Sequence, residues 1–324
     1  MKNIGLVGLG NQMYADLIPA LLGCADIARI IAFCDIDPKK LDQTKKIFPN
    51  ATGYAHYQEL LEHESVDSII VSVPHHLYFP ITSVASKKGV AVFKEKPFAI
   101  NEEEAKKIVQ LYEQTDVPIY TVAKRRFYKS YQMIKKHLSK IGLLYQYNAR
   151  HFLSSGTLHT GWRSKTKEAG GGILMDLGYH LIDITRDFFG MPDSLWMLKS
   201  NKGLPGYRYE VEDSASLLLS YPNGTHGSFQ VCCYSGVKEE SLEIVGSLRT
   251  IKIDNGDITF LEQNTKEIRQ AVPIDSIRAN KEALQEFFTG EKSAMTNNIK
   301  EHYDNMRIIE AAYRSAQSGI WSQL

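Results

Sequence analysis

Two separated groups of residues could handle a proton during an oxidation or a reduction. Lys96 follows the apolar run 90–93, and Asp176 and His180 stand four residues apart further along the chain. If the second segment is helical, this spacing places carboxylate and imidazole on one face, where the carboxylate can orient the imidazole or bind substrate hydroxyls. An alcohol releases a hydride only as its hydroxyl proton is removed, so a lysine or a histidine must lie near that oxygen. The pattern indicates Lys96, Asp176 and His180 as candidate catalytic residues.

Each group also has a purely structural interpretation. Lys96 would then be a surface lysine in a charged loop, and His180 a histidine satisfied on a helix surface. The residues next to Lys96 and His180 favour a catalytic role over the structural one. Glu95-Lys96-Pro97 stands at the end of an apolar strand, where open α/β sheets bind ligands, and Gly170-Gly171-Gly172 suits a loop that approaches a ligand closely.

A nucleotide site is indicated near the N-terminus. Gly8 and Gly10 follow the apolar run 4–7 and open a helix, as in a Rossmann unit, where glycines bring backbone N–H groups to a pyrophosphate. Asp35 follows the run 30–34, about where a carboxylate accepts hydrogen bonds from the adenosine ribose. A carboxylate there repels a 2′-phosphate, which favours NAD, with NADP as the alternative. Otherwise Asp35, or Asp37, only caps the next helix.

Two further features belong to the predicted nucleotide site. The third glycine of the fingerprint would fall at Met13, so the close helix-to-strand packing must be achieved differently, or the phosphate path is altered. A second loop at the same sheet edge, residues 72–80, holds His75 and His76. These histidines could contact the cofactor, or they could simply face solvent.

Short apolar runs alternate with helical patterns in the first part of the chain. The runs 4–7, 30–34, 68–73, 90–93 and 119–123 predict the strands of a doubly wound parallel sheet. Beyond Lys124 the pattern changes to antiparallel hairpins, with 215–221 and 227–234 flanking the turn 222–224 and a second set over 242–261. We expect an α/β Rossmann domain over 1–123 and an α+β domain with a large, mostly antiparallel sheet over 124–324. Its terminal helix, 303–317, could pack back onto the first domain.

Taken together, these motifs resemble the glucose-fructose oxidoreductase, inositol dehydrogenase and rhizopine-catabolism (Gfo/Idh/MocA) family. The resemblance spans nearly the whole chain and depends on the glycine loop, on Glu95-Lys96-Pro97 and on the run from Gly170 to His180. It also includes Arg125-Arg126-Phe127, Trp162-Arg163, Glu212-Asp213 and the terminal YRSAQSG. The sequence departs from the family at Met13, and at His75 and Tyr78, where many relatives have Asn and His.

The resemblance implies roles for individual residues. Lys96 corresponds to the active-site lysine, Asp176 to a substrate-contacting carboxylate and His180 to the acid/base that exchanges the hydroxyl proton, while Arg163 lies near nicotinamide or substrate. It also implies an open-faced second sheet, a homodimer or homotetramer formed through that sheet, and a cis bond before Pro97. The predicted cofactor contacts are Gly8, Gly10, Asn11, Gln12, Met13, Asp35, Val73, Pro74, His75, Glu95, Lys96 and Arg163. The predicted substrate contacts are Lys96, Arg126, Arg163, Asp176 and His180.

Composition excludes several classes of function. The 324 residues contain 38 lysines and arginines against 37 aspartates and glutamates, so no global field favours nucleic acid or an anionic membrane surface. No apolar run approaches the roughly 20 residues of a membrane span, and the N-terminus does not read as a signal peptide, so we expect a cytoplasmic protein. The four cysteines lack metal-ligand spacing, and no metal is expected.

The sequence therefore predicts an NAD(P)-dependent dehydrogenase or reductase. Its hydride would pass between nicotinamide and a secondary alcohol or ketone carbon of a sugar, an inositol or a sugar derivative. Two alternatives stay open: an NAD-dependent glycosidase that oxidises its sugar transiently, and a non-catalytic regulator that senses NAD or a sugar. Retention of all three catalytic candidates argues against the regulator. Arg126, Arg163, Lys165 and Lys167 could create a positive field suited to a phosphorylated or carboxylated sugar.

Overall fold

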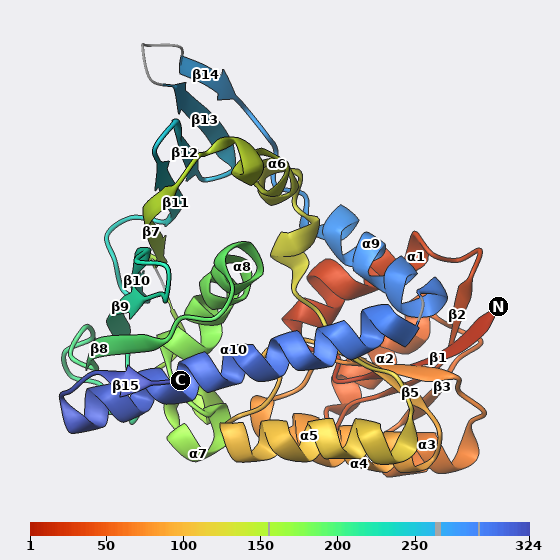
Figure 1. Cartoon of the computed structure of the whole chain (residues 1–324). Coiled ribbons are helices and arrows are strands. Elements are labelled where there is room, and N and C mark those ends of the chain that lie inside the picture. The colour runs from red at the N-terminus through yellow and green to blue at the C-terminus, as the bar shows by residue number, and fades with distance from the viewer. Residues whose placement is uncertain (155, 263–266, 291) are drawn as a thin grey trace. The chain divides into compact units, whose positions relative to one another are not determined.

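The computed structural model describes residues 1–154, 156–262, 267–290 and 292–324. The chain divides into two compact units, each built on one β-sheet (Figure 1). The first unit contains Met1–Lys124 and Ser276–Tyr303, and the second contains Arg125–Asp275 and Asp304–Leu324. The boundary expected after residue 123 therefore falls at Lys124, but residues 276–303 lie in the first unit. They form helix α9 (Ser276–Thr289) and the first part of α10 (Lys292–Ser318).

The first unit holds a six-stranded parallel sheet in the order β3-β2-β1-β4-β5-β6. The order reverses between β1 and β4, and sheets of this kind bind ligands at the carboxyl edge beside such a reversal. The strands are β1 (Lys2–Val7), β2 (Ala28–Cys34), β3 (Thr52–Tyr54), β4 (Ser68–Val71), β5 (Ala91–Lys94) and β6 (Ile119–Thr121).

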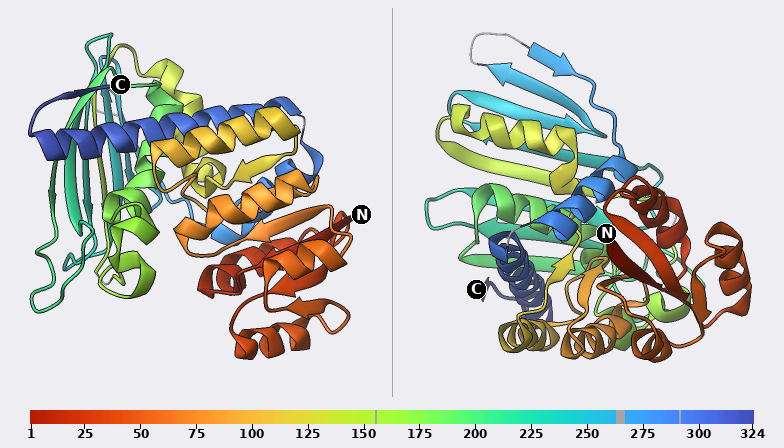
Figure 2. Two further views of the ribbon diagram at one scale, coloured as in Figure 1. Left: turned by 90° about the horizontal axis from the view of Figure 1, so that it is seen from below. Right: turned by 90° about the vertical axis from the view of Figure 1, so that its right-hand side faces the viewer.

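Helices cover both faces of this sheet. Helices α3, α4 and α5 lie side by side on one face, and α1 and α9 lie together on the other (Figures 1 and 2). Two of the helices on this sheet begin at side-chain caps: Asn101 accepts a hydrogen bond from the Glu104 N–H, and Asp37 accepts one from the Lys39 N–H. The helical segments are η1 (Met13–Leu17), α1 (Ile18–Leu22), α2 (Pro38–Ile47), α3 (Tyr57–His63), η2 (His75–Leu77), α4 (Tyr78–Lys87) and α5 (Glu102–Thr115).

The second unit holds a nine-stranded sheet in the order β14-β13-β12-β11-β7-β10-β9-β8-β15. Its neighbouring strands are antiparallel except for β7 and β10. The predicted hairpins are present, with β9 paired to β10 across the turn 222–224 and β12 paired to both β11 and β13. The strands are β7 (Leu144–Phe152), β8 (Ser194–Ser200), β9 (Ser214–Ser220), β10 (His226–Cys232), β11 (Glu239–Gly246), β12 (Arg249–Asp254), β13 (Asp257–Glu262), β14 (Glu267–Gln270) and β15 (Ser322–Gln323).

One face of the second sheet packs on helix α8, as Figure 2 shows. Tyr147 of β7 stacks on Phe189 of α8 with ring centroids 4.7 Å apart. Along β9, buried Leu217 alternates with Leu218, which points to the opposite face and is exposed. The expected open-faced sheet is therefore present. The helical segments of this part are η3 (Lys124–Phe127), α6 (Lys129–His137), η4 (Leu138–Lys140), η5 (Gly161–Ser164), α7 (Thr166–Ala169), η6 (Leu174–Gly178), α8 (Tyr179–Phe189) and the second part of α10.

The expected fold class, a doubly wound Rossmann sheet plus an α+β unit with a mostly antiparallel sheet, is confirmed. The differences lie at short elements and at element ends. Strand β4 stops at Val71, because the chain turns at Val73 and Pro74 towards the next helix. Strand β3 is absent from the sequence-based prediction, because its three residues contain no apolar run and its pairing with β2 defines it.

Three further properties concern membranes, metals and disulfides. None of the helices in the described part of the chain is long and apolar enough to cross a membrane. Within the same residues, no group of three or more His, Cys, Asp or Glu side chains is placed to hold a metal ion. All four cysteines carry free thiols.

Candidate active site

The glycine loop lies where β1 ends beside β4. Gly8 has a φ of +85°, and a Cβ there would lie 2.3 Å from the Ser72 carbonyl oxygen and 2.6 Å from a methyl of Val73. Only glycine avoids both the strain and the clash. A Cβ at Gly10, in contrast, would have no other protein atom within 4 Å. This open space, at the start of a helix, fits the close backbone approach that a pyrophosphate requires.

Asp35 joins the end of β2 to the glycine loop. Its side chain is 8% exposed, and it accepts hydrogen bonds from the Leu9 N–H at 2.7 Å and the Asp37 N–H at 2.9 Å. The Lys40 ammonium lies 3.5 Å away. The cap of α2 is Asp37, not Asp35. The place of Asp35 beside the glycine loop fits the ribose-binding acid of a Rossmann domain.

The helix after the glycine loop begins at the exposed Asn11 and passes directly into the π-helical segment η1. Met13, at the position of the third glycine, starts that segment and is fully buried. A π-helical turn is wider than an α-helical turn and is frequent at functional sites. The departure from the fingerprint at Met13 is therefore accompanied by a departure from regular α-helix at the same residues.

Gln12 connects this helix to the loop that carries Lys96. Its amide donates a hydrogen bond to Glu95 Oε1 at 3.2 Å, and the Glu95 N–H donates to the Val71 carbonyl at 3.0 Å. Lys96 is half-buried, and the Lys96-Pro97 peptide bond is cis, as the family resemblance implied. The structure thus brings Lys96 to the sheet edge that the glycine loop occupies.

The loop after β4 places its two histidines differently. His75 is buried, and its ring stacks on Tyr78 with centroids 6.0 Å apart. His76 has its Nδ1 buried without a hydrogen-bond partner among the described residues. Val73 and Pro74, the other predicted cofactor contacts of this loop, are half-buried beside the glycine loop. A buried unsatisfied nitrogen is costly, so His76 rather than His75 offers this loop a polar atom for a ligand or water.

The buried side chain of Lys94 holds the loop that carries Lys96. It is 0% exposed, and its ammonium donates to the carbonyls of Pro97 and Phe98 at 2.8 and 2.9 Å. It also lies 4.8 Å from the centre of the Tyr78 ring, so it links the loop after β4 to the loop after β5. Burial lowers the pKa of Lys94 to about 7, although the carboxylates of Glu104 and Glu95 oppose this shift.

The stability contributed at Lys94 should depend on pH. An unfolded lysine titrates near 10.4, so between about pH 7 and pH 10 the unfolded chain holds a proton that folded Lys94 has released, and the free energy of unfolding rises with pH. Lys94→Met lacks this contribution. Urea unfolding at pH 6.5 and 9 should therefore show a larger deficit of Lys94→Met relative to wild type at pH 9. Lys87→Met, at an exposed lysine of α4, is the control, and an equal deficit at both pH values would contradict the burial argument.

Asp176 and His180 lie on one continuous helix of the second unit. This helix starts at Ile173, passes through the π-helical segment η6 and continues as α8. Asp176 is half-buried and His180 is buried. In a π-helical turn more than 3.6 residues complete one turn, so residues four apart are better aligned than in a regular α-helix. The helical segment that the Asp-to-His spacing required is present.

The positive side chains predicted near the substrate are partly neutralised. Arg126 forms a bidentate ion pair with Asp183, which is 2% exposed. Lys165 forms an ion pair with Glu168 at 2.7 Å. Arg163 is exposed and stacks over the Trp162 ring at 4.4 Å. These pairs weaken the positive field that the sequence suggested for this region.

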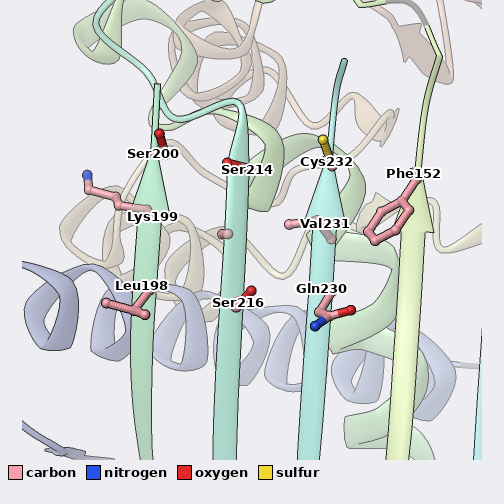
Figure 3. A pocket seen from close by; sticks show the side chains of 10 residues that line it. Phe152, Leu198, Lys199, Ser200, Ser214, Ser216, Gln230, Val231 and Cys232 are labelled. Atoms are coloured by element: carbon pink, nitrogen blue, oxygen red, sulfur yellow. The ribbon is translucent and has the colours of Figure 1, made fainter. Parts of the chain in front are cut away.

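A shallow depression of about 390 Å³ lies on the open face of the second sheet (Figure 3). Leu198, Ser216 and Gln230 line it from three neighbouring strands. These residues alternate with the buried ones that face α8, so the depression lies on the face opposite to Asp176 and His180. It is therefore not part of the candidate active site.

The fold and these two sets of residues define a class of protein: an oxidoreductase with a nucleotide-binding Rossmann unit and a second unit that carries an acid and a histidine on one helix. Residues 2–123 match the description "Oxidoreductase family, NAD-binding Rossmann fold", and residues 131–252 match the "GFO/IDH/MocA C-terminal domain". The chain belongs to the Gfo/Idh/MocA oxidoreductase family. NAD is the cofactor of its first unit.

Individual proteins are similar to this chain at moderate identity. An uncharacterized oxidoreductase of Schizosaccharomyces pombe is 25% identical, over 87% of this chain and 88% of that protein. The D-apiose dehydrogenase of Rhizobium rhizogenes is 24% identical, over 94% of this chain and 96% of the enzyme. The structure of levoglucosan dehydrogenase in complex with NADH and levoglucosan has a TM-score of 0.85 at 17% identity, over 99% of both chains. At that identity the structural similarity shows the fold alone.

Proposed function

We propose that this protein is an NAD-dependent dehydrogenase or reductase that moves a hydride between nicotinamide and a secondary alcohol or ketone carbon of a sugar or an inositol. The observation that carries the proposal is the hydrogen bond from Gln12 to Glu95, because it ties the Lys96 loop to the glycine-loop helix. A lysine beside the nucleotide loop is suited to the proton transfer that alcohol oxidation requires. The similarity to a D-apiose dehydrogenase supports a sugar substrate.

In this proposal the residues of the chain position the reactants and move one proton. Bound NAD supplies the hydride acceptor. His180 takes the substrate hydroxyl proton, Lys96 hydrogen-bonds to the same oxygen, and Asp176 orients His180 or binds a neighbouring hydroxyl. In the reverse direction His180 returns the proton. Arg163 contacts nicotinamide or substrate, as the family resemblance implied.

We further infer that NAD is preferred over NADP and that the substrate is neutral. The Asp35 carboxylate would repel a 2′-phosphate. The ion pairs of Arg126 with Asp183 and of Lys165 with Glu168 leave less positive charge for a phosphate or a carboxylate on the substrate. A phosphorylated sugar is therefore the less favoured alternative.

The test is the absorbance at 340 nm of the purified protein with NAD or NADP. The panel contains neutral aldoses, inositols, amino sugars, sugar acids and sugar phosphates, and it includes the reverse reaction with NADH and the corresponding ketones. We expect reduction of NAD, faster than that of NADP, with at least one neutral sugar or inositol. Turnover confined to sugar phosphates would remove the inference about a neutral substrate.

Silence across the panel would remove the dehydrogenase proposal. If the protein then cleaved a glycoside without net formation of NADH, it would be a glycosidase that oxidises its sugar transiently. If it bound NADH and did neither reaction, a sensing role would replace catalysis. Product analysis by chromatography, run on the same mixtures, separates these two outcomes.

We also propose that the second unit forms the oligomer interface, as the family resemblance implied. Its open sheet face exposes apolar side chains, among them Leu198 at 57% and Leu218 at 47%. Exposed apolar side chains that share one face are typical of interaction surfaces. Light scattering that returned only the monomer mass of 36.6 kDa at micromolar concentration would remove this proposal.

A further inference from the structure

Three of the motifs that resemble the family meet at one buried carboxylate. Glu212, of the Glu212-Asp213 pair, is 4% exposed, and it contacts both the glycine run 170–172 and the terminal helix. The Tyr313 hydroxyl of α10 donates a hydrogen bond to Glu212 Oε1 at 2.9 Å. All of these residues belong to the second unit.

Glu212 satisfies three consecutive backbone donors at the start of the helix that carries Asp176 and His180. Its Oε1 accepts hydrogen bonds from the N–H groups of Gly172 and Leu174, both at 3.0 Å. Its backbone carbonyl accepts one from the Ile173 N–H between them, at 2.8 Å. The first N–H groups of a helix have no partner within the helix, and they are usually satisfied by a side chain of the preceding residues. Here a residue about 40 positions later in the chain takes that role.

This contact requires two of the three glycines. A Cβ at Gly172 would lie 1.9 Å from the Glu212 carbonyl oxygen, and a Cβ at Gly171 would lie 2.0 Å from the Tyr313 hydroxyl. The close approach expected of this glycine run is therefore to Glu212 and Tyr313. Burial raises the pKa of Glu212, while hydrogen bonds from the backbone and from Tyr313 lower it.

We propose that Glu212 is a positioning residue: by holding the amides of residues 172–174 it sets the axial position and rotation of the helix that presents Asp176 and His180. This inference rests on the proposed function for its catalytic consequence, but not for its structural part. A shift of the helix start would move both side chains together, and a misplacement of about 1 Å can cost about 100-fold in rate.

The experiment compares three substitutions of Glu212, which separate the effect of side-chain length from the effect of charge. Glu212→Gln keeps an oxygen at the Oε1 position without the charge, so kcat should stay within about 3-fold of wild type. Glu212→Asp keeps the charge but is shorter by one methylene, about 1.5 Å, so kcat should fall by about 10- to 100-fold. In Glu212→Ala, kcat should fall at least as far as in Glu212→Asp. The Kd for NADH should be unchanged in all three, because the glycine loop belongs to the other unit.

A control corrects for lost stability. Tyr221→Phe removes a buried 2.8 Å hydrogen bond to Tyr147 in the same unit, away from the glycine run, and should lower Tm with little change in kcat. If Glu212→Asp lost no more kcat than Tyr221→Phe at a comparable loss of Tm, the contact would be merely structural and the proposal would fail. An equal loss of kcat in Glu212→Gln and Glu212→Asp would also overturn the proposal, since the length of the side chain would then not decide the rate.

Hydrogen exchange separates this inference from the proposed function. Without any substrate, Glu212→Asp should speed the exchange of the amides of residues 172–178, and Glu212→Gln should leave them protected. Unchanged exchange in Glu212→Asp would refute the positioning role, whatever the activity. A wild-type protein that oxidises no sugar would refute the proposed function, while the exchange result would still decide whether Glu212 holds this helix start.

Discussion

Replacing His180 with asparagine is expected to lower kcat by about 10²- to 10⁴-fold, the range that general acid–base catalysis supplies. Asparagine keeps a polar side chain of similar size, but it cannot exchange a proton near neutral pH. Because Gly8 and Asp35 belong to the other unit, the affinity for NADH should stay at the wild-type value. Steady-state kinetics with the substrate found at 340 nm, together with a fluorescence titration of NADH, would measure both quantities.

The matched control is His226→Asn. His226 is an exposed histidine of β10 in the same unit, and its Nε2 lies 3.0 Å from Gln146 Oε1. Its substitution should leave kcat within about 2-fold of wild type, since exposed substitutions away from special features have small effects. Lys96→Met should resemble His180→Asn in losing kcat. Full turnover by both His180→Asn and Lys96→Met would show that the acid/base assignment is wrong.

The elements that sequence periodicity predicted are those buried in a regular pattern. Residues 69–71 of β4 are buried on both faces, and they read as a continuous apolar run because helices cover both sides of the parallel sheet. Along β9, Ala215, Leu217 and Leu219 are buried and the residues between them are not, which is the period of two that indicates one covered face. Strand β3 lacks such a local signal, and its pairing with β2 defines it. Helix α9 has buried apolar residues at helical spacing, Ala279, Ala283, Leu284 and Phe287, so its pattern is readable as a helix, but the pattern does not show that the helix belongs to the first unit.

The same distinction explains which parts of the candidate site could be predicted. Gly8, Asp35 and Lys96 belong to short motifs at strand ends, so their residue types and spacing carried the signal. Lys94 and Glu212 were not assigned a role from sequence. Lys94 reads as a charged residue at the end of a strand, and only its complete burial shows that it supports the loop of Lys96. For Glu212, the sequence signal is that the Glu212-Asp213 pair is one of the motifs that resemble the family.

The charges near the predicted substrate site have partners that the sequence does not reveal. The sequence predicts Arg126 and Lys165 as charges available to a substrate, because it shows a charge but not the partner of that charge. In the structure their charges face Asp183 and Glu168. Asp183 also accepts a hydrogen bond from the Asn305 side chain at 2.8 Å, so a residue from the far end of the chain completes this network. Such pairings depend on tertiary contacts that no local pattern encodes.

The second large effect is expected at Gly10. Gly10→Ala should raise the Kd for NADH by about 5- to 150-fold, because an added methyl in a closely packed contact costs about 1–3 kcal/mol. Tm of the free protein should not change, since a Cβ at Gly10 has no other protein atom within 4 Å. Gly8→Ala should lower both Tm and the affinity for NADH, because its Cβ would meet the Ser72 carbonyl and its φ is +85°. Isothermal titration with NADH and thermal unfolding measure the two quantities separately.

Comparing Gly10→Ala with Gly8→Ala tests whether the open space at Gly10 holds the pyrophosphate of the cofactor. Gly236→Ala is the control, because Gly236 also has no other protein atom near its Cβ position and lies in the second unit, so neither Tm nor the affinity for NADH should change. If Gly10→Ala bound NADH as wild type does, no phosphate would approach the backbone there, and the departure at Met13 would mark an altered phosphate path. Weaker binding at an unchanged Tm would place the pyrophosphate against Gly10, so that the buried Met13 replaces the third glycine without moving the cofactor.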